Sequence, residues 1–419
     1  MGKAHSARPG TVHRRGPNDR FYWRVTLPGE TRRKEIPLRP AGHQHATTDA
    51  KIAEQIADAL WRDAALGDAP AHFTGSVASL TSLYMQWARD RYRHANGAPT
   101  SQVSLCRSAL AYLVRGIGTL PAEDMNASLL EGVRRSMVDA DLARRTVNTY
   151  TKVIKHAFKW GAQQGLLSPH VYGGLIIVDG MRAGEAGVRE TPPVTTVARE
   201  HVQAAIDHAP SILADMIRLH ALTGMRPGEL VTMRPADVDR VGVEVRVSPE
   251  PDARVWLYRP RHHKTKHRGK ERTIVLGPQA QAILAPYLLR DPETPCFSPA
   301  EVVRERGTRV RRYASARAPG DAYTTQTYAR AVRWALLAAR RALVSRLAEG
   351  MGIGLARERA KVAIPLWAPN RLRHNVATAA ARTSLDVSSA LLGHTSLNTT
   401  LIYAERDMHK AAAWAAKHG

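Results

Sequence analysis

The chain has 419 residues and carries 61 Lys and Arg against 37 Asp and Glu, which gives a formal net charge of +24. This length predicts two or three domains, and the 44% hydrophobic content excludes a wholly disordered protein. A strongly basic chain attracts polyanions, because each Lys or Arg placed on a phosphate releases condensed counterions. Nucleic acid is therefore the expected partner, and a solvated basic surface is the simpler alternative.

Cys106 and Cys296 lie far apart in the sequence and neither belongs to a CxxC pair. The sequence therefore indicates neither a zinc site nor a disulfide framework. The basic N-terminus lacks the apolar run of a signal peptide, and no stretch approaches the ~18 apolar residues of a membrane span. We expect a soluble, cytoplasmic protein with no metal, no cofactor and no membrane partner.

Residues 1–70 are predicted to form a basic N-terminal arm. Residues 21–27 are rich in aromatic and β-branched side chains, a turn signal follows, and 32–38 can return as a second strand. The arm is then either a small β-hairpin that contacts DNA or a flexible solvated tail. A helix is expected to follow over 49–66.

Residues 71–180 are predicted to form a helical domain, because apolar residues recur there at helical spacing in four separate runs. The clearest run begins at Arg144 and ends near Gly165, and its apolar stripe is expected to face the core. The other face carries basic side chains that suit either a DNA backbone or a solvated surface. These side chains are Arg144, Arg145, Lys152, Lys155 and Lys159.

A charged stretch punctuated by Gly and Pro, 181–196, is expected to be a linker to a C-terminal domain over 197–419. The elements predicted in that domain are helices at 199–208 and 211–223, strands at 243–248, 254–258 and 272–276, a long helix over 321–348, and an irregular spacer or short helix over 349–364. The fold class is therefore mainly α with a small antiparallel β-sheet (α+β).

Cutting DNA without a metal needs a nucleophile for phosphorus, positive charge for the non-bridging oxygens and an acid for the leaving 5′ oxygen. Arginine suits the second task, because its planar fork pairs with two phosphate oxygens and stays charged. Tyrosine suits the first task, because a phosphotyrosine ester keeps the energy of the broken bond and allows rejoining without ATP.

The C-terminal domain contains residues of these kinds in a fixed order. Its first element places Arg226 at the start of a predicted helix, where backbone N–H groups also face anions. The elements are Thr223-Gly224-Met225-Arg226-Pro227-Gly228-Glu229-Leu230, His263-Lys264-Thr265-Lys266, Asn370-Arg371-Leu372-Arg373-His374, Leu392-Gly393-His394-Thr395 and Thr400-Leu401-Ile402-Tyr403-Ala404.

This series resembles the tyrosine recombinase (phage integrase) family. The first box of that family reads TGxRxxEL, and residues 223–230 match it. The second box reads HxLRH and is followed by LGH and by a tyrosine at a set distance; here Tyr403 stands nine residues after His394, as that distance requires. The similarity is strongest over 197–407. It extends to 73–178, which is similar to the helical (SAM-like) core-binding domain of the family.

The resemblance implies a catalytic role for each residue that matches the boxes. Arg226 and Arg373 hold the scissile phosphate, and His394 hydrogen-bonds it. Tyr403 attacks the phosphate and forms a 3′-phosphotyrosyl intermediate. Glu229 resembles the acidic residue that braces the first arginine from behind.

The acid for the 5′ oxygen is Lys264 by the same resemblance. Lys266 and Lys270 lie in the same turn and stay open as alternatives. His374 is interpreted as structural. The segment between 300 and 365 is longer than the family pattern leads one to expect.

Asn370 departs from the family, which usually has histidine at that position. Asparagine can donate a hydrogen bond to phosphate, but it cannot exchange a proton near neutral pH. General-base help from this position would be worth ~10²–10⁴-fold in rate. The alternative function is therefore a DNA-binding protein of the same fold that no longer cuts.

The favoured function remains a site-specific DNA recombinase or integrase of a mobile element, and a relaxing topoisomerase with the same chemistry is a third hypothesis. The implied partners are double-stranded DNA, three further copies of the chain in a tetramer on paired sites, and accessory DNA-bending factors.

Overall fold

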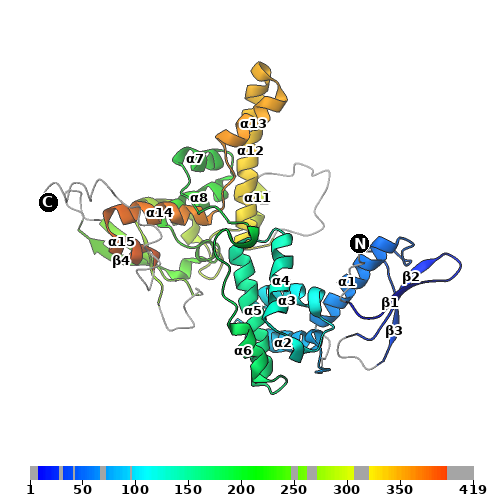
Figure 1. Cartoon of the computed structure of the whole chain (residues 1–419). Helices are drawn as coiled ribbons and strands as arrows, with labels where there is room; N and C mark the ends of the chain where they lie inside the picture. The colour runs from blue at the N-terminus through cyan, green and yellow to red at the C-terminus, as the bar shows by residue number, and fades with distance from the viewer. Residues whose placement is uncertain are drawn as a thin grey trace, which may run out of the picture. The chain divides into compact units, whose positions relative to one another are not determined.

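The computed structural model describes residues 8–27, 32–40, 43–66, 72–94, 97–246, 253–261, 271–305 and 320–393. The chain divides into two compact units, Met1–Pro192 and Pro193–Gly419 (Figure 1). Each unit has its own buried hydrophobic cluster. No helix within the described ranges is both long enough and apolar enough to cross a bilayer.

The first unit begins with a three-stranded antiparallel sheet in the order β1-β2-β3. The strands are β1 (Thr11–Arg15), β2 (Arg20–Val25) and β3 (Lys34–Pro37), and the helix α1 (Ala50–Leu66) follows them. Phe21, Trp23 and Val25 alternate inward along β2, as the period of two requires, and pack with α1 in the core. The two predicted strands and the helix are confirmed, and over the described residues the arm is folded.

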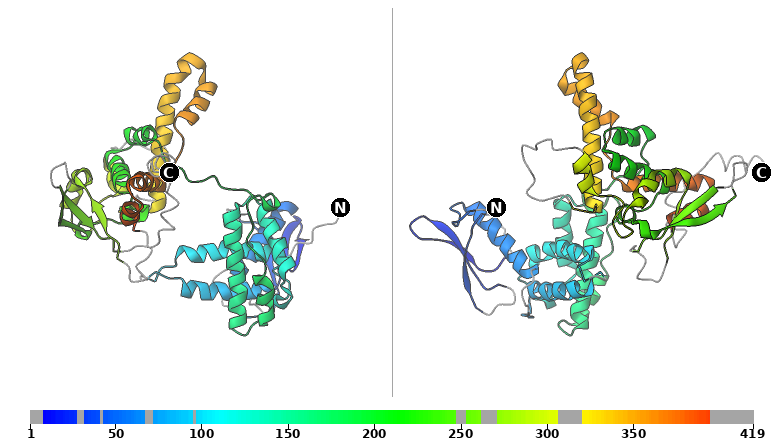
Figure 2. Two further views of the ribbon diagram at one scale, coloured as in Figure 1. Left: turned by 60° about the vertical axis from the view of Figure 1, so that its left-hand side comes forward. Right: turned by 180° about the vertical axis from the view of Figure 1, so that it is seen from behind.

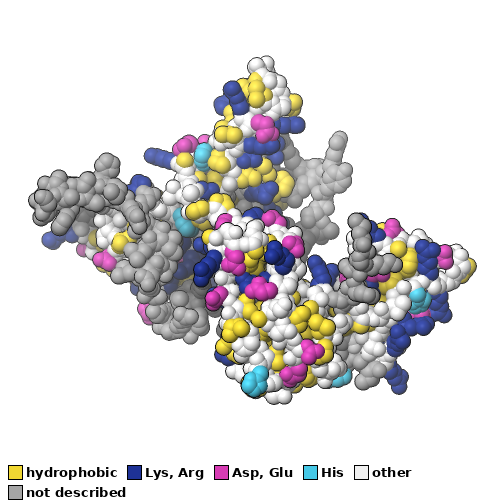
Figure 3. All heavy atoms as spheres, viewed as in Figure 1, with side chains coloured by type: hydrophobic (Ala, Val, Ile, Leu, Met, Phe, Trp, Pro, Cys, Tyr) yellow, Lys and Arg dark blue, Asp and Glu magenta, His cyan; other side chains and the backbone are white. Residues whose placement is uncertain are grey.

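Strand β1 is absent from the prediction, because its sequence Thr-Val-His-Arg-Arg holds one large aliphatic side chain and no alternation. It pairs with β2 from Thr11 opposite Arg24 to Arg15 opposite Arg20. Lys and Arg side chains gather over this sheet (Figure 3). Arg14, Arg15 and Arg24 are among the exposed ones.

Among the described residues of the first unit, five further α-helices follow, with short 3₁₀ turns η1 (Ala122–Asp124) and η2 (Glu185–Gly187). They are α2 (Val77–Arg91), α3 (Ser101–Ile117), α4 (Ala127–Asp139), α5 (Arg144–Gln163) and α6 (Pro169–Ile176). The side chains of Ser76, Thr100 and Asn126 accept backbone N–H bonds at the starts of α2, α3 and α4. The four predicted helical runs are confirmed. The prediction missed α6, although Ser168 followed by Pro169 is a helix-start signal.

The predicted linker, 181–196, is anchored at a few points, and its other residues are exposed. Met181 and Val188 are buried in the first unit, and the side-chain amide of Asn148 both donates to and accepts from the backbone of Met181. Val197 is held in the second unit by Asn375, whose side chain bonds its N–H at 2.8 Å and its carbonyl at 2.6 Å. The segment between these anchors is therefore short.

The second unit is helical around a second three-stranded antiparallel sheet, in the order β4-β5-β6 (Figures 1 and 2). Its helices are α7 (Arg199–Asp207), α8 (Ser211–Thr223), α9 (Pro227–Val231), α10 (Pro278–Leu284), α11 (Pro299–Glu305), α12 (Thr325–Met351), α13 (Ile353–Ala363), α14 (Asn370–Thr383) and α15 (Leu385–Leu392), with 3₁₀ turns η3 (Pro235–Asp237) and η5 (Ala285–Leu289). Its strands are β4 (Val238–Val245), β5 (Ala253–Tyr258) and β6 (Ile274–Leu276). The predicted class, mainly α with small antiparallel sheets, is confirmed.

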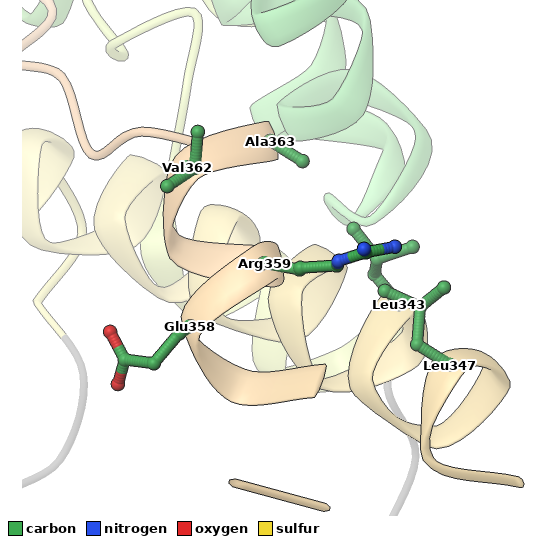
Figure 4. Close-up of a pocket in the computed structure, with 6 residues that line it drawn as sticks. All are labelled: Leu343, Leu347, Glu358, Arg359, Val362 and Ala363. Carbon is green, nitrogen blue, oxygen red and sulfur yellow. The ribbon is translucent and has the colours of Figure 1, made fainter. Parts of the chain in front are cut away.

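The expanded segment before the second box is a helical hairpin. Helix α12 begins at Thr325, and Gly352 at a φ of +76° turns the chain into α13, which lies beside α12 (Figure 2). Of the two predictions for 349–364, the short helix is correct and the irregular spacer is wrong. Arg340 closes the hairpin by donating from Nε to the carbonyl of Ile364 at 2.7 Å. A shallow pocket of about 500 Å³ lies between the two helices (Figure 4).

Candidate active site

The first box forms a sharp connection between two helices. Helix α8 ends at Thr223, Gly224 follows in the left-handed region with a φ of +59°, and α9 begins at Pro227. The buried ring of His220 donates from Nε2 to the carbonyl of Met225 at 2.9 Å. Burial holds the pKa of His220 down, to about 4. The ring is therefore neutral at physiological pH and fixes the connection without adding charge.

We expect Gly224→Ala to lower the free energy of unfolding by about 1–3 kcal/mol, because a non-glycine residue at positive φ is strained. A Cβ at this position would also lie 2.8 Å from Cβ of Val376 in α14. Chemical denaturation measures the effect. Gly228→Ala is the matched control, since its Cβ would meet only Cγ2 of Thr325, at 3.8 Å. Equal stability of the two variants would contradict this account of the connection.

Arg226 is placed by the carboxylate three residues after it. Its backbone N–H donates to Oε2 of Glu229 at 2.7 Å, and its guanidinium Nη1 donates to Oε1 at 2.9 Å. The Glu229 side chain is only 3% exposed, whereas that of Arg226 is 31% exposed. The pair therefore presents a guanidinium at the surface on a buried, negatively charged support.

The Glu229 carboxylate is ionised although it is buried. Burial by itself would raise its pKa, but the charges of Arg272 and Arg226 and the backbone N–H of Arg226 outweigh burial and hold the pKa below the ordinary value. The carbonyl of Glu229 also accepts a bond from the Tyr258 hydroxyl at 2.7 Å, which ties α9 to β5. The backbone position and the charge of this residue are thus both set.

Arg373, from the second box, is buried in α14 and joins two other parts of the site. Its Nη1 donates to the carbonyl of Gly224 at 2.8 Å, and its Nη2 donates to the carbonyl of Leu392 at 2.7 Å. The first contact reaches the connection that carries Arg226. The second reaches the end of α15, directly before Gly393. The structure therefore brings Arg226, Glu229 and Arg373 together.

Asn370 and His374 occupy the same helix as Arg373. Asn370 is the first residue of α14 and is exposed. His374 is partly buried, and burial together with the charges of Arg373 and Arg371 lowers its pKa. A neutral His374 at physiological pH accords with its interpretation as a structural residue.

Sequence reasoning missed Arg272, which it treated only as the start of a strand. The side chain is 4% exposed, and its Nη1 donates to the carbonyl of Leu391 at 3.0 Å. Its Nε lies 3.5 Å from Oε1 of Glu229. The sequence did carry a signal that Arg272 is buried. In the predicted strand over 272–276, positions 272, 274 and 276 share one face, and Ile274 and Leu276 are apolar and belong to β6.

Five predicted site residues lie outside the described residues: Lys264, Lys266, Lys270, His394 and Tyr403. Described elements precede each of them in the chain. The lysines belong to the segment that connects β5 and β6, which pair as antiparallel neighbours. Helix α15 ends at Leu392 with Gly393 at a φ of +61°, directly before His394.

The basic side chains of α5 are in two different environments. Arg145, Lys152 and Lys159 are exposed and follow one another at intervals of seven residues, which places them on one stripe of the helix. Arg144 forms an ion pair with Glu190. Lys155 donates to the carbonyl of Val178, and burial and the charge of Arg134 lower its pKa.

Solved structures with this fold include DNA-bound integrases. They include a lambda integrase dimer bound to a COC′ core site (TM-score 0.50, 14% identity, covering 79% of this chain and 96% of that one). Others are the Tn1549 transposon integrase in complex with transposon right end DNA (0.51, 14%, 82% and 99%) and a lambda integrase tetramer bound to a Holliday junction (0.50, 14%, 94% and 94%). At these identities the likeness establishes the fold. No curated protein gives a significant match.

The second unit combines a partly exposed arginine and a buried one with a small antiparallel sheet, and the chain shares its fold with these integrases. The family model described as "Phage integrase family" matches residues 197–410. The chain belongs to the phage integrase family, and it is a site-specific recombinase. The resemblance drawn from the boxes is thereby confirmed.

Proposed function

We propose that this recombinase cuts DNA with Tyr403 while Arg226 and Arg373 hold the scissile phosphate. The observation that carries the proposal is the convergence of the two arginines on one connection, with Arg373 bonded to the carbonyl of Gly224 and Arg226 two residues further on. The order of the boxes and the nine-residue step from His394 to Tyr403 support the same assignment.

The proposed step exchanges one phosphodiester for another. The Tyr403 oxygen forms a bond to phosphorus, the bond from phosphorus to the 5′ oxygen breaks, and a 3′-phosphotyrosyl ester remains. The tyrosine proton leaves to solvent or a nearby base, and Lys264 gives a proton to the 5′ oxygen. Lys266 and Lys270 are the alternative acids. The reverse step rejoins the strand without an external energy source.

The two arginines are suited to different parts of this task. Arg226 is partly exposed and can meet a phosphate directly, and its buried partner Glu229 holds its backbone N–H. Arg373 is buried, and its Nη1 and Nη2 bond the carbonyls of Gly224 and Leu392, so its positive charge is held in a fixed place beside Arg226. Preorganised positive charge of this kind stabilises charge that develops in a transition state. His394 adds a hydrogen bond to the phosphate.

We propose duplex DNA as the substrate, because the net charge of +24 suits a polyanion. In this proposal 197–419 is the catalytic domain, 71–180 is the core-binding domain with Arg144, Arg145, Lys152, Lys155 and Lys159 toward the backbone, and 1–70 is an additional arm. A solved lambda integrase is a tetramer on a Holliday junction, which supports a tetramer on paired sites here. Accessory DNA-bending factors and action in the cytoplasm belong to the same proposal.

The test is covalent trapping on nicked duplexes that tile the DNA flanking the gene, because a nick near the cut prevents rejoining. The proposal expects a protein–DNA band that resists SDS. Tight binding to a duplex without such a band would favour the alternative, a DNA-binding protein that no longer cuts. Relaxation of plasmid DNA without site preference would favour a topoisomerase.

Asn370 gives a more specific prediction. If its exposed amide donates one hydrogen bond to the phosphate, Asn370→Ala should slow formation of the covalent complex by about ten- to a hundredfold, since a bond to a charged group is worth about 1.5–3 kcal/mol. Because an amide does not titrate, the loss should not vary with pH between about 6 and 8. Initial rates at several pH values measure it. Cleavage by Asn370→Ala at the wild-type rate would show that this position takes no part.

A further inference from the structure

We propose that Arg272 is a positioning residue that takes over the Glu229 carboxylate when Arg226 turns to the scissile phosphate. The inference rests on the proposed function, because it assumes that Arg226 binds the phosphate. Arg272 stands two residues before the start of β6, and no box of the sequence pattern contains it.

One carboxylate oxygen faces both guanidinium groups. Oε1 of Glu229 accepts a hydrogen bond from Nη1 of Arg226 at 2.9 Å. The same oxygen lies 3.5 Å from Nε of Arg272, beyond a good hydrogen bond. In this arrangement Arg226 holds the oxygen, and Arg272 is the second donor beside it.

Arg272 has unused donors in this arrangement. Within the described residues, its Nε and Nη2 are buried and have no hydrogen-bond partner. A buried N–H without an acceptor is unfavourable, so a small shift of Glu229 toward Arg272 would be favoured once Arg226 releases the oxygen. The Glu229 carboxylate can therefore form new hydrogen bonds with these Arg272 donors.

The rest of the Arg272 side chain is fixed in place. Its Nη1 donates to the carbonyls of Thr273 at 3.2 Å and Leu391 at 3.0 Å. The turn after α15 also lies close to the guanidinium. A Cβ on Gly393 would lie 2.7 Å from this Nη1, so a side chain at position 393 would clash with it. The two bonds from Nη1 hold Arg272 beside the carboxylate, so the transfer requires movement of Glu229.

The transfer matters because Glu229 also orients Arg226. Its other oxygen, Oε2, accepts the backbone N–H of Arg226 at 2.7 Å. The charged and titratable groups that face Glu229 within the described residues are Arg226, Arg272, His220 and Tyr258. When Arg226 is on the phosphate, Arg272 is the remaining cation of this set, because burial keeps His220 neutral. It keeps Glu229 ionised and in place.

Four variants test the transfer: Arg272→Gln, Arg272→Lys, Glu229→Gln and the double change Arg272→Gln with Glu229→Gln. The probe is the nicked duplex that gives the most covalent complex, and initial rates are measured from about pH 5 to about pH 9. The charge of Arg272 is the largest of the influences that lower the pKa of Glu229, so we expect its loss to raise that pKa and activity to fall as the pH drops toward the raised value.

We expect Arg272→Gln to slow cleavage about tenfold at alkaline pH and further at acid pH, with unchanged affinity for the duplex. Glu229→Gln should remove the additional acid loss, because an amide does not titrate, and the double variant should be no slower than the slower single variant. Arg272→Lys keeps the charge without the fork and should regain part of the acid-side activity. It supplies the pH profile if Arg272→Gln does not fold.

Several results would overturn the inference. One is that Arg272→Gln slows cleavage by the same factor at every pH, and that its effect adds to that of Glu229→Gln in the double variant. Together these two results would show that Arg272 only contributes to packing. A different result would show that the proposed function itself is wrong. In that case Arg226→Ala would cleave like the wild type, with Arg272 present or replaced. If the wild type formed no covalent complex on any duplex, the proposed function and this inference would both be lost.

Discussion

Replacement of Tyr403 by phenylalanine is expected to abolish the covalent protein–DNA complex, lowering its rate of formation by about 10⁴-fold or more, the scale of nucleophile removal in other enzymes. Affinity for the duplex should stay unchanged, because the phenolic oxygen adds no positive charge and so releases no counterion. Trapping on nicked duplexes measures the first quantity, and a gel-shift titration at fixed salt measures the second.

Tyr287→Phe is the matched control for this loss. It removes the same hydroxyl group from a tyrosine of the second unit, where the hydroxyl donates to Oδ2 of Asp215 at 2.8 Å. This control should cleave normally and lose only about 1 kcal/mol of stability, the net value of one hydrogen bond. A covalent band of normal strength from Tyr403→Phe would remove Tyr403 from the mechanism.

Arg373→Ala should impair both cleavage and folding. Truncation leaves the carbonyls of Gly224 and Leu392 without their donor, and each buried acceptor left unmatched costs about 1–3 kcal/mol. We therefore expect a loss of about 2–4 kcal/mol in the free energy of unfolding, together with a fall in cleavage of about 10²–10³-fold. Urea denaturation and covalent trapping measure the two effects separately.

Arg226→Ala is the control that separates the two roles. Its cleavage should fall by a similar factor of about 10²–10³. Its stability should fall less, because the Arg226 side chain is 31% exposed and Arg272 still faces the Glu229 carboxylate. If Arg373→Ala had wild-type stability, or if Arg226→Ala were the less stable of the two, the division into a buried connector and an exposed phosphate ligand would be wrong.

The residues of the boxes could be predicted from the sequence, because their signals are local. Gly224 followed by Pro227 marks the end of one helix and the start of the next, and the structure has α8 and α9 at these places. The link between the boxes could not be predicted in the same way. Arg373 bonds the carbonyl of Gly224 across 149 positions of the chain, and no local pattern indicates which carbonyl a buried arginine will contact.

The α12–α13 hairpin shows a second limit of local reasoning. Gly350, Gly352 and Gly354 follow one another at alternate positions, a pattern that disfavours a helix, and the prediction left an irregular spacer and a short helix open. The chain instead turns once, at Gly352, and α13 is stabilised by packing against α12 and by Arg340 at its end. Tertiary packing thus outweighed a local signal, as it does for many helices.

For Arg272 the sequence held a local signal of burial, but nothing in the sequence indicated that the signal mattered. Alternation placed this arginine on the same face as Ile274 and Leu276, yet a basic residue beside a basic turn is more often solvated. Its importance follows only from its neighbours, which are the carbonyl of Leu391 and the carboxylate of Glu229. Two buried arginines, Arg272 and Arg373, therefore hold consecutive carbonyls at the end of α15, where a helix carries partial negative charge.

The most direct measurement of the central claim is the chemical identity of the trapped bond. The covalent complex would be digested with protease and nuclease, and the nucleotide-bearing peptide would be sequenced by mass spectrometry. Our account predicts that Tyr403 carries the nucleotide, joined through the 3′ phosphate, while the released strand has a free 5′ hydroxyl. A nucleotide on any other residue, or a bond to the 5′ phosphate, would contradict it.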